Sequence, residues 1–266
     1  MAGPRPGLRL PALAALAQLG LGPCLAAALA CEAPQAPVLG AAVNGIDARG
    51  DLTLSSGEGA RLVGLRFPEP PGQWLDPASL DALLAPYRGL APIAADPAAR
   101  TDRWGRIPVW VASSSGNQAD SLALALLREG LALTWPPELP PNCRILYLNA
   151  EAAARGSAKG RWSDMQNAVL EAADGAAVAM RAGQLALMQG RVMHVGQTRR
   201  AIYLNFGRRG EGASAELSLA IWREMEREGW TSASIRGRMV RIRGIVSEAR
   251  PARLLVGAAS ALEKLD

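Results

Sequence analysis

Short apolar segments separated by glycine-containing turns occupy residues 38–67. They read PVLGAAVNG, DLTLSS and RLVGLRF, and two glycines flank Glu58 in the turn before the third segment. Glycine accepts the left-handed dihedrals that a tight reversal needs, so the pattern predicts three strands joined by turns. Further strands are predicted near 90–95 and 106–112, on either side of the polar loop DPAARTDRWGR. Short strands in this succession predict a small barrel.

Helical segments are predicted among and after these strands. The first covers 77–87 and begins after Asp76, which is a suitable N-cap. The second, at 121–130, repeats leucine at helical spacing and ends at Gly130. The third covers 143–162 and is rich in alanine. The predicted fold class is mainly β with α (α+β), with the helices packed on the barrel.

A second strand-rich region covers residues 183–266 and follows a linker or helix at 165–182. Its strand segments lie at 184–195, 200–207, 215–222 and 238–257, with a helical stretch at 223–230. Gly190 and Gly244 fall inside strand segments, as glycines do at the tight bends of small barrels. This pattern predicts a second, smaller OB-like barrel that acts as an accessory domain.

The second region allows two interpretations of its basic and aromatic residues. A basic face with aromatic rings could bind single-stranded nucleic acid through charge and stacking. The residues concerned are Arg199, Arg200, Arg208, Arg209, Tyr203 and Phe206. Alternatively, the aromatic side chains belong to the core and the domain is structural. Because aromatic residues make up only 5% of the chain, the structural interpretation is favoured.

The N-terminal segment 1–30 has the pattern of a secretory signal peptide. Arg5 and Arg9 precede an uncharged apolar run whose last letters, ALA, form an Ala-x-Ala cleavage context. A membrane anchor is the weaker alternative, because glycine and proline interrupt the run and it is barely long enough to span a bilayer. Lipidation of Cys31 after cleavage is a further alternative. We therefore expect an exported protein, periplasmic or secreted, without a stable membrane span.

The use of cysteine and histidine limits the chemistry. Cys31 and Cys143 remain after cleavage, and an oxidising compartment would allow a disulfide between them. With a single histidine, His194, and no Cys-x-x-Cys motif, the sequence lacks a zinc ligand set. The formal net charge of +5 is compatible with a polyanionic partner such as DNA or RNA.

Four separated segments carry a resemblance to a known family. They are GDLTLSSGEGARLVGLRFPEP, TDRWGR, LALALLREGLALTW and AEAAARGSAKGRW, in this order. In their order and spacing they resemble the thermonuclease, or staphylococcal nuclease-like, family over residues 38–164. The resemblance implies an OB-type barrel with packed helices and a calcium-dependent hydrolysis of DNA and RNA. Residues 183–266 are similar, less specifically, to a C-terminal extension found in some bacterial members.

The resemblance also implies a catalytic set. The family's chemistry uses two arginines to neutralise charge on the phosphoryl oxygens, and a glutamate to position or deprotonate the attacking water. Arg61 in ARLVGL matches the first arginine, and Arg106 at the end of TDRWGR matches the second. Glu69 in the Pro-Glu pair matches the glutamate. We therefore expect Arg61, Glu69 and Arg106 to converge on one cleft.

The calcium ligands that the resemblance implies are altered in this sequence. The family's Asp-(Thr/Ala)-Pro-Glu motif reads RFPE here, so the Arg66 guanidinium stands where a ligand carboxylate is expected. A positive charge at that position repels Ca²⁺. Asp51 can serve as a metal ligand after a one-residue slip, whereas an ungapped match puts Gly50 there. We expect Arg66 to lie beside Glu69, to pair with it and to exclude the cation.

These observations lead to three hypotheses. The first is an exported thermonuclease-like protein with a degraded calcium site, weak or no nuclease activity and a binding role. The second is an active secreted or periplasmic phosphodiesterase that cleaves DNA or RNA. The third is an envelope interaction module without a nucleic-acid function. The sequence specifies no oligomeric state.

Overall fold

The computed structural model describes residues 3, 31, 35–113, 120–164, 169–208, 210–248 and 251–265. The expected signal peptide lies outside the described residues apart from residue 3, and so does part of the expected linker, at 165–168. Within the described ranges, no helix is long and apolar enough to cross a membrane. Several β sheets and separate helices make up the described chain, which confirms the predicted α+β class.

The first sheet is built from strands that the sequence predicts between residues 38 and 112. They are β1 (Val43–Ile46), β2 (Leu52–Leu54), β3 (Gly59–Leu62), β5 (Ile93–Ala94) and β6 (Ile107–Trp110). Their order is β1-β2-β3-β6-β5, and β3 runs parallel to β6 with Arg61 opposite Pro108. A separate pair joins β4 (Leu65–Arg66) to β7 (Leu133–Thr134). Arg61 therefore lies on β3, and Arg106 directly precedes β6, the parallel neighbour of β3.

Helices accompany this sheet where the sequence predicts them. α1 (Pro77–Leu84) begins after Asp76, whose carboxylate accepts hydrogen bonds from the backbone amides of the first turn. α2 (Leu122–Arg128) and α3 (Pro141–Gly156) follow β6. Shorter 3₁₀ turns are η1 (Pro71–Gln73), η2 (Ala85–Tyr87), η4 (Pro136–Glu138) and η5 (Gly160–Ser163).

The end of α3 differs from the single helix predicted over 143–162. α3 stops at Gly156, and the chain continues into η5. Gly160 has a φ of +51°, and a Cβ there would lie 2.7 Å from the Gly130 carbonyl oxygen. The Arg161 amide donates to that same oxygen at 3.0 Å. Because the two segments approach so closely, only glycine fits at this position, and the turn fixes the backbone of Arg161.

An aliphatic core lies between the first sheet and its helices. Leu52 and Val109 come from the sheet, and Leu122 and Leu126 come from α2. None of these side chains is more than 1% exposed. Because α2 is apolar around most of its surface, it is buried on several sides instead of lying on the surface.

A disulfide joins Cys31 to Cys143, with the Cα atoms 4.5 Å apart. Both cysteines are buried, and Cys143 lies in the first turn of α3. The bond closes a loop with a sequence separation of 112 residues. A crosslink over so long a loop restricts the unfolded chain strongly.

The second sheet contains the strands that follow residue 168. They are β8 (Leu170–Glu171), β9 (Leu185–Gln197), β10 (Ala201–Phe206), β11 (Ser214–Ser218), β12 (Met239–Val246), β13 (Arg253–Leu255) and β14 (Leu262–Lys264). The order is β14-β12-β13-β11-β10-β9-β8, and β12 also pairs with β9, so the pairings form a closed ring. Gly244 allows β12 to approach β13, because a Cβ there would lie 2.3 Å from the Leu255 carbonyl oxygen. Leu204, Leu217 and Val240 belong to a second apolar core.

The main helix of the second sheet begins earlier than predicted. The sequence predicts a strand over 215–222, but α5 (Leu219–Arg227) begins inside this segment. The Ser218 side chain accepts a hydrogen bond from the Ile221 amide and caps the helix. The apolar residues at 219–222 therefore belong to a helix and not to a strand, and Trp222 packs in the second core. The other helices described after residue 168 are α4 (Gly175–Ala179), α6 (Ser232–Ile235) and the 3₁₀ turn η7 (Ala259–Ala261).

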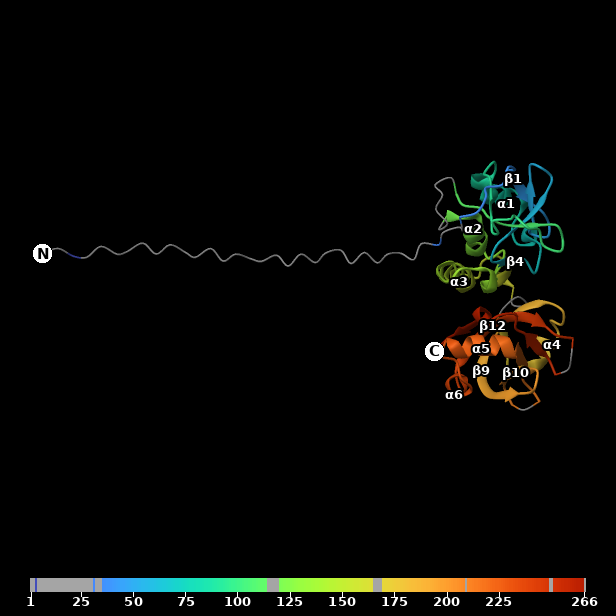
Figure 1. The fold of residues 1–266 in the computed structure, drawn as a ribbon, viewed down its shortest axis with the longest axis vertical. Coiled ribbons are helices and arrows are strands. Elements are labelled where there is room, and N and C mark those ends of the chain that lie inside the picture. Colours follow the sequence, from blue (N-terminus) through green and yellow to red (C-terminus); the bar gives the residue numbers. More distant parts are fainter. Residues whose placement is uncertain are drawn as a thin grey trace.

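The two parts of the chain meet beside α3, which lies between the two sheets (Figure 1). Glu151 of α3 is fully buried, and its Oε1 accepts a hydrogen bond from Arg243 Nη2 of β12 at 2.8 Å. Arg243 Nη2 also lies 3.0 Å from Glu263 Oε1 of β14. An apolar cluster crosses the same boundary and contains Leu133, Ala154, Trp162 and Leu187. Buried ionic and apolar contacts therefore join the two domains.

Candidate functional site: an arginine cavity

A cavity of about 280 Å³ lies at the ends of β3, β4 and β6. We call it the arginine cavity, because Arg49, Arg61, Arg66 and Arg106 line it. Its other lining residues are Gly50, Asp51, Leu62, Leu65, Phe67, Asp102 and Trp104. Both predicted catalytic arginines, the predicted metal ligand Asp51, and Arg66 thus line the cavity.

Asp102 holds the two predicted arginines together. Its Oδ2 lies 3.3 Å from Arg61 Nε and 2.8 Å from Arg106 Nη2. Its Oδ1 accepts hydrogen bonds from the Trp104 and Arg106 amides, which closes the turn before β6. Burial raises the pKa of the Asp102 carboxyl, but the hydrogen bonds from Arg106 and from the turn outweigh it and lower that pKa to about 2.

Asp51 faces Arg106 across the cavity. Asp51 Oδ1 accepts a hydrogen bond from Arg106 Nη1 at 2.7 Å. Gly50 explains how Asp51 reaches this place: its φ is +82°, and a Cβ there would lie 2.2 Å from the Phe67 ring. Phe67 therefore packs directly on the glycine backbone, and the turn aims the Asp51 carboxylate at Arg106.

Glu138 is a central acid that sequence reasoning missed. Its carboxylate accepts hydrogen bonds from Arg61 Nη1 at 2.7 Å, from Arg66 Nη2 at 2.5 Å and from the Gly64 amide at 3.2 Å. Burial raises the pKa of the Glu138 carboxyl, but Arg66 and Arg61 outweigh it, so that pKa lies below its ordinary value. No sequence motif predicts a role for Glu138. It lies in η4, which follows β7, and only the pairing of β7 with β4 brings η4 close to Arg61 and Arg66.

Glu69 does not join Arg61 and Arg106, contrary to the prediction. Its carboxylate accepts two hydrogen bonds from the Arg161 guanidinium, at 3.1 and 3.5 Å. Arg161 is only 5% exposed, so this pair is largely removed from water. The expected pair between Arg66 and Glu69 is also wrong, since Arg66 binds Glu138. Two of the three predicted catalytic residues therefore share the cavity, and Glu69 lies beside it.

Trp104 is the exposed aromatic residue at the rim of the cavity, with 62% of its surface accessible. The Arg103 guanidinium lies 3.9 Å from the centre of its ring, and the Arg106 guanidinium lies 4.8 Å away. Cation–π contacts hold the ring in place without burying it. An indole ring flanked by guanidinium groups offers a stacking surface next to positive charge.

The carboxylates of the cavity do not fit a calcium site. Ca²⁺ binds six to eight oxygen ligands, most of them from carboxylates and carbonyls. Asp51, Asp102 and Glu138 each accept hydrogen bonds from arginine side chains instead. In the described ranges, no group of three or more histidine, cysteine, aspartate and glutamate side chains is placed to hold a metal ion. Asp51, the metal ligand that the resemblance implies, is therefore bound to the Arg106 guanidinium instead.

A second cavity, of about 420 Å³, adjoins the arginine cavity at the boundary between the domains. We call it the interdomain cleft. Arg66 and Phe67 line both spaces. The other residues of the cleft are Pro68, Glu69 and Trp135 from the first domain and Gly183, Gln184, Leu185 and Ile245 from the second.

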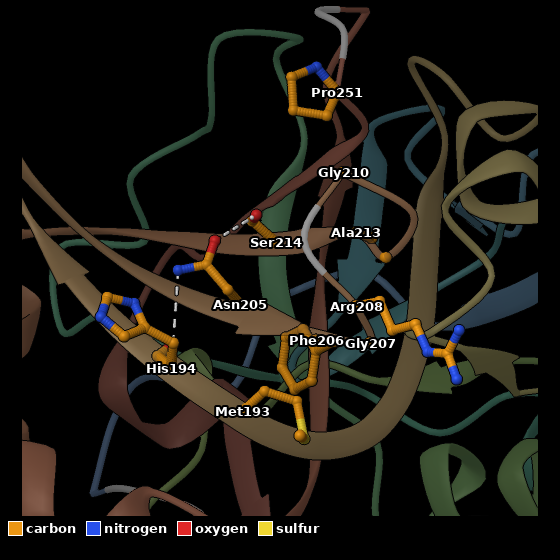
Figure 2. Close-up of a pocket in the computed structure, with 11 residues that line it drawn as sticks. Met193, His194, Asn205, Phe206, Gly207, Arg208, Gly210, Ala213, Ser214 and Pro251 are labelled. Atoms are coloured by element: carbon orange, nitrogen blue, oxygen red, sulfur yellow. Dashed lines mark hydrogen bonds between the residues drawn. The ribbon is translucent and has the colours of Figure 1, made fainter.

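The second domain has a cavity of its own, of about 640 Å³. Figure 2 shows Asn205 between His194 and Ser214, and Ser214 Oγ donates to Asn205 Oδ1 at 2.9 Å. The proposed stacking residues do not form an aromatic platform there. Phe206 is only 2% exposed and belongs to the core, and the Tyr203 ring is contacted by Arg253 at 5.6 Å. Arg209 lies outside the described residues.

Comparison with known proteins does not identify a family for this chain. No protein family matches the chain, and no curated protein does. Among solved structures, it is similar to "OBody AM3L15 bound to hen egg-white lysozyme", with 19% identity over 35% of this chain and 92% of that chain and a TM-score of 0.27. It is also similar to "OBody AM1L10 bound to hen egg-white lysozyme", with 17% identity over 35% of this chain and 91% of that chain and a TM-score of 0.27. Likenesses at this level define neither a family nor a function.

Proposed function

We propose that this chain is an exported thermonuclease-like protein that binds single-stranded nucleic acid in the arginine cavity, with weak or no nuclease activity. The observation that carries the proposal is the grouping of Arg61, Arg66 and Arg106 around one cavity. Guanidinium groups suit phosphate because they donate hydrogen bonds in a fixed fork. Trp104 at the rim supplies a stacking surface for a base.

The proposed family fold has support in the strand order. In the first sheet, β3 pairs in parallel with β6, and Arg61 on β3 and Arg106 just before β6 both contact Asp102. In the second sheet, the pairing of β12 with β9 and the parallel pairing of β11 with β13 fit a closed OB-like barrel. Both arrangements suit a thermonuclease-like domain followed by a smaller accessory barrel.

Weak or absent cleavage is expected because the nearby carboxylates have lowered pKa values or are bound to arginine. A general base must accept a proton from water, and a carboxylate with a low pKa does so poorly at neutral pH. Asp102 has a pKa of about 2, and the pKa of Glu138 is also lowered. Glu69, the expected base, is bound to Arg161. Asp102, Glu138 and Glu69 are therefore poorly suited to activate water.

A plasmid-digestion assay with and without Ca²⁺ tests the catalytic half of the proposal. We expect no cation-stimulated cleavage by the wild type. Strong Ca²⁺-dependent cleavage would contradict it and would favour the alternative of an active exported phosphodiesterase. The substitution Glu69→Gln then serves as a check, because a residual activity that survives it cannot use Glu69 as base.

The binding half is tested by fluorescence anisotropy with labelled oligothymidylate at several salt concentrations. Arg66→Gln should weaken binding and reduce the slope of log K against log salt by about 0.7, as expected for the loss of one phosphate contact on a single strand. Trp104→Ala should weaken binding at every salt concentration. Ile145→Ala, at an exposed position of α3, is the matched control and should have no effect. Absence of any binding would favour an envelope interaction module instead.

A further inference from the structure

The interdomain cleft and the arginine cavity share two lining residues. Arg66 and Phe67 border both spaces, so a ligand that contacts Arg66 in the arginine cavity lies next to the cleft. The cleft differs in chemistry from the cavity, because the second domain contributes two apolar side chains, Leu185 and Ile245, beside the polar Gln184. Ile245 of β12 is 41% exposed there, and Leu185 of β9 stands on the same side.

This apolar wall is held in place by contacts between the domains. Arg243, two residues before Ile245, is 2% exposed and is bound to Glu151 of the first domain at 2.8 Å. Leu187, two residues after Leu185, belongs to the apolar cluster that crosses the boundary. Both strands are therefore fixed next to the residues that line the cleft, and the wall exists before any ligand binds.

The charges of the cleft favour an occupant that combines an anion with an apolar ring. Arg66 at the junction contacts the Trp135 ring at 5.1 Å, and its only carboxylate contact in the described chain is Glu138. Glu69 is neutralised by Arg161, so it does not repel an anion strongly. A phosphate beside Arg66 would bring the next base of a single strand against Ile245 and Leu185. Trp104 offers an exposed aromatic surface in the arginine cavity and does not line the cleft.

We infer that a single strand of nucleic acid bound in the arginine cavity extends into the interdomain cleft, where the second domain supplies the apolar wall for a base. This inference rests on the proposed function, and it gives the second domain a part in binding. The occupant is single-stranded because the bases of a duplex are paired and cannot turn toward a wall. Long strands should therefore bind more tightly than the arginine cavity alone explains.

The test compares two apolar positions of nearly equal exposure, of which one lines the cleft and the other does not. Ile245 and Leu255 are paired across β12 and β13 and are 41% and 42% exposed, but only Ile245 lines the cleft. Ile245→Glu and Leu255→Glu add the same charge to the full-length protein. We expect Ile245→Glu to weaken binding of octathymidylate about tenfold relative to Leu255→Glu. For dithymidylate, which the arginine cavity can hold alone, the two variants should bind equally.

Further measurements distinguish a failure of this inference from a failure of the proposed function and from misfolding of a variant. Ile245→Gln carries no charge and should show a smaller loss in the same direction, so the test survives if the glutamate variant fails to fold. Equal loss in the Ile245 and Leu255 variants would overturn the inference and leave the proposed function standing, provided that Arg66→Gln and Trp104→Ala still weaken binding. The same dependence on Ile245 for inorganic polyphosphate would also overturn it, because the wall would not be contacting a base. No binding of either oligonucleotide to the wild type overturns both.

Discussion

The buried ion cluster between the domains gives the sharpest test of the fold. Glu151 accepts hydrogen bonds from Arg243 at 2.8 Å, from Arg155 at 3.2 Å and from the Thr134 amide at 2.7 Å. Glu151→Gln keeps the shape of the side chain but removes its charge and turns an NH₂ group toward one of these donors. Arg243 would then rely on Glu263 alone, because its Nε and Nη1 have no hydrogen-bond partner among the described residues.

The cost follows from burial. Glu151 is 0% exposed and Arg243 is 2% exposed, so water cannot replace the lost interaction. Breaking a buried pair by neutralising one partner costs about 3–5 kcal/mol. The remaining contact to Glu263 puts the expected loss of unfolding free energy near the lower limit, about 3 kcal/mol. Glu129→Gln breaks an exposed pair with Lys159 and should change stability by less than about 1 kcal/mol.

Guanidinium chloride unfolding, followed by tryptophan fluorescence and far-UV circular dichroism, measures both variants. The wild type should unfold in one transition, because buried contacts join the domains. Glu151→Gln should lower the midpoint and separate the transitions of the two domains. Arg243→Met in the same chain should recover part of the loss, since it removes the uncompensated cation. A loss below about 1 kcal/mol in Glu151→Gln would refute the reasoning, because it would place this cluster in contact with water.

Three further outcomes are expected. Glu138→Gln frees two arginines of the cavity from their internal anion, so it should tighten binding of oligothymidylate in the anisotropy assay, and unchanged or weaker binding would count against the proposed site. Against the opposing effect of burial, hydrogen bonds lower the folded-state pKa of Asp102 to about 2, below its ordinary value of 3.8, so its contribution to stability is present above pH 4 and is lost as the pH falls through 2. This contribution is about 1 kcal/mol after allowance for solvent screening at the cavity mouth, and urea unfolding should therefore show that Asp102→Asn is less stable than the wild type near neutral pH, by a margin that shrinks in acid. Reduction of the Cys31–Cys143 bond should cost about 4–5 kcal/mol by the loop-closure estimate, and an unchanged melting temperature in the reduced protein would contradict it.

Much of the local structure could be predicted from the sequence, because local interactions decide it. Asp76 caps α1 as predicted, since its carboxylate needs only the amides of the next turn. The strand segments around Arg61 and Arg106 also form where alternation and turn residues place them. The early start of α5 was missed, because a short apolar run fits the buried face of a helix as well as a strand.

The partners of the charged residues could not be predicted in this way. Arg66 pairs with Glu138, 72 positions further along the chain, and Glu69 pairs with Arg161, 92 positions away. A guanidinium group binds any carboxylate that the fold brings within reach, and nothing in the local sequence distinguishes Glu69 from Glu138 as that partner. The sequence by itself therefore determined most of the elements and the positions of Arg61 and Arg106 within and beside predicted strand segments. Only the tertiary structure decided which acids neutralise those arginines, because the β4–β7 pairing and the turn at Gly160 set the distances between distant parts of the chain.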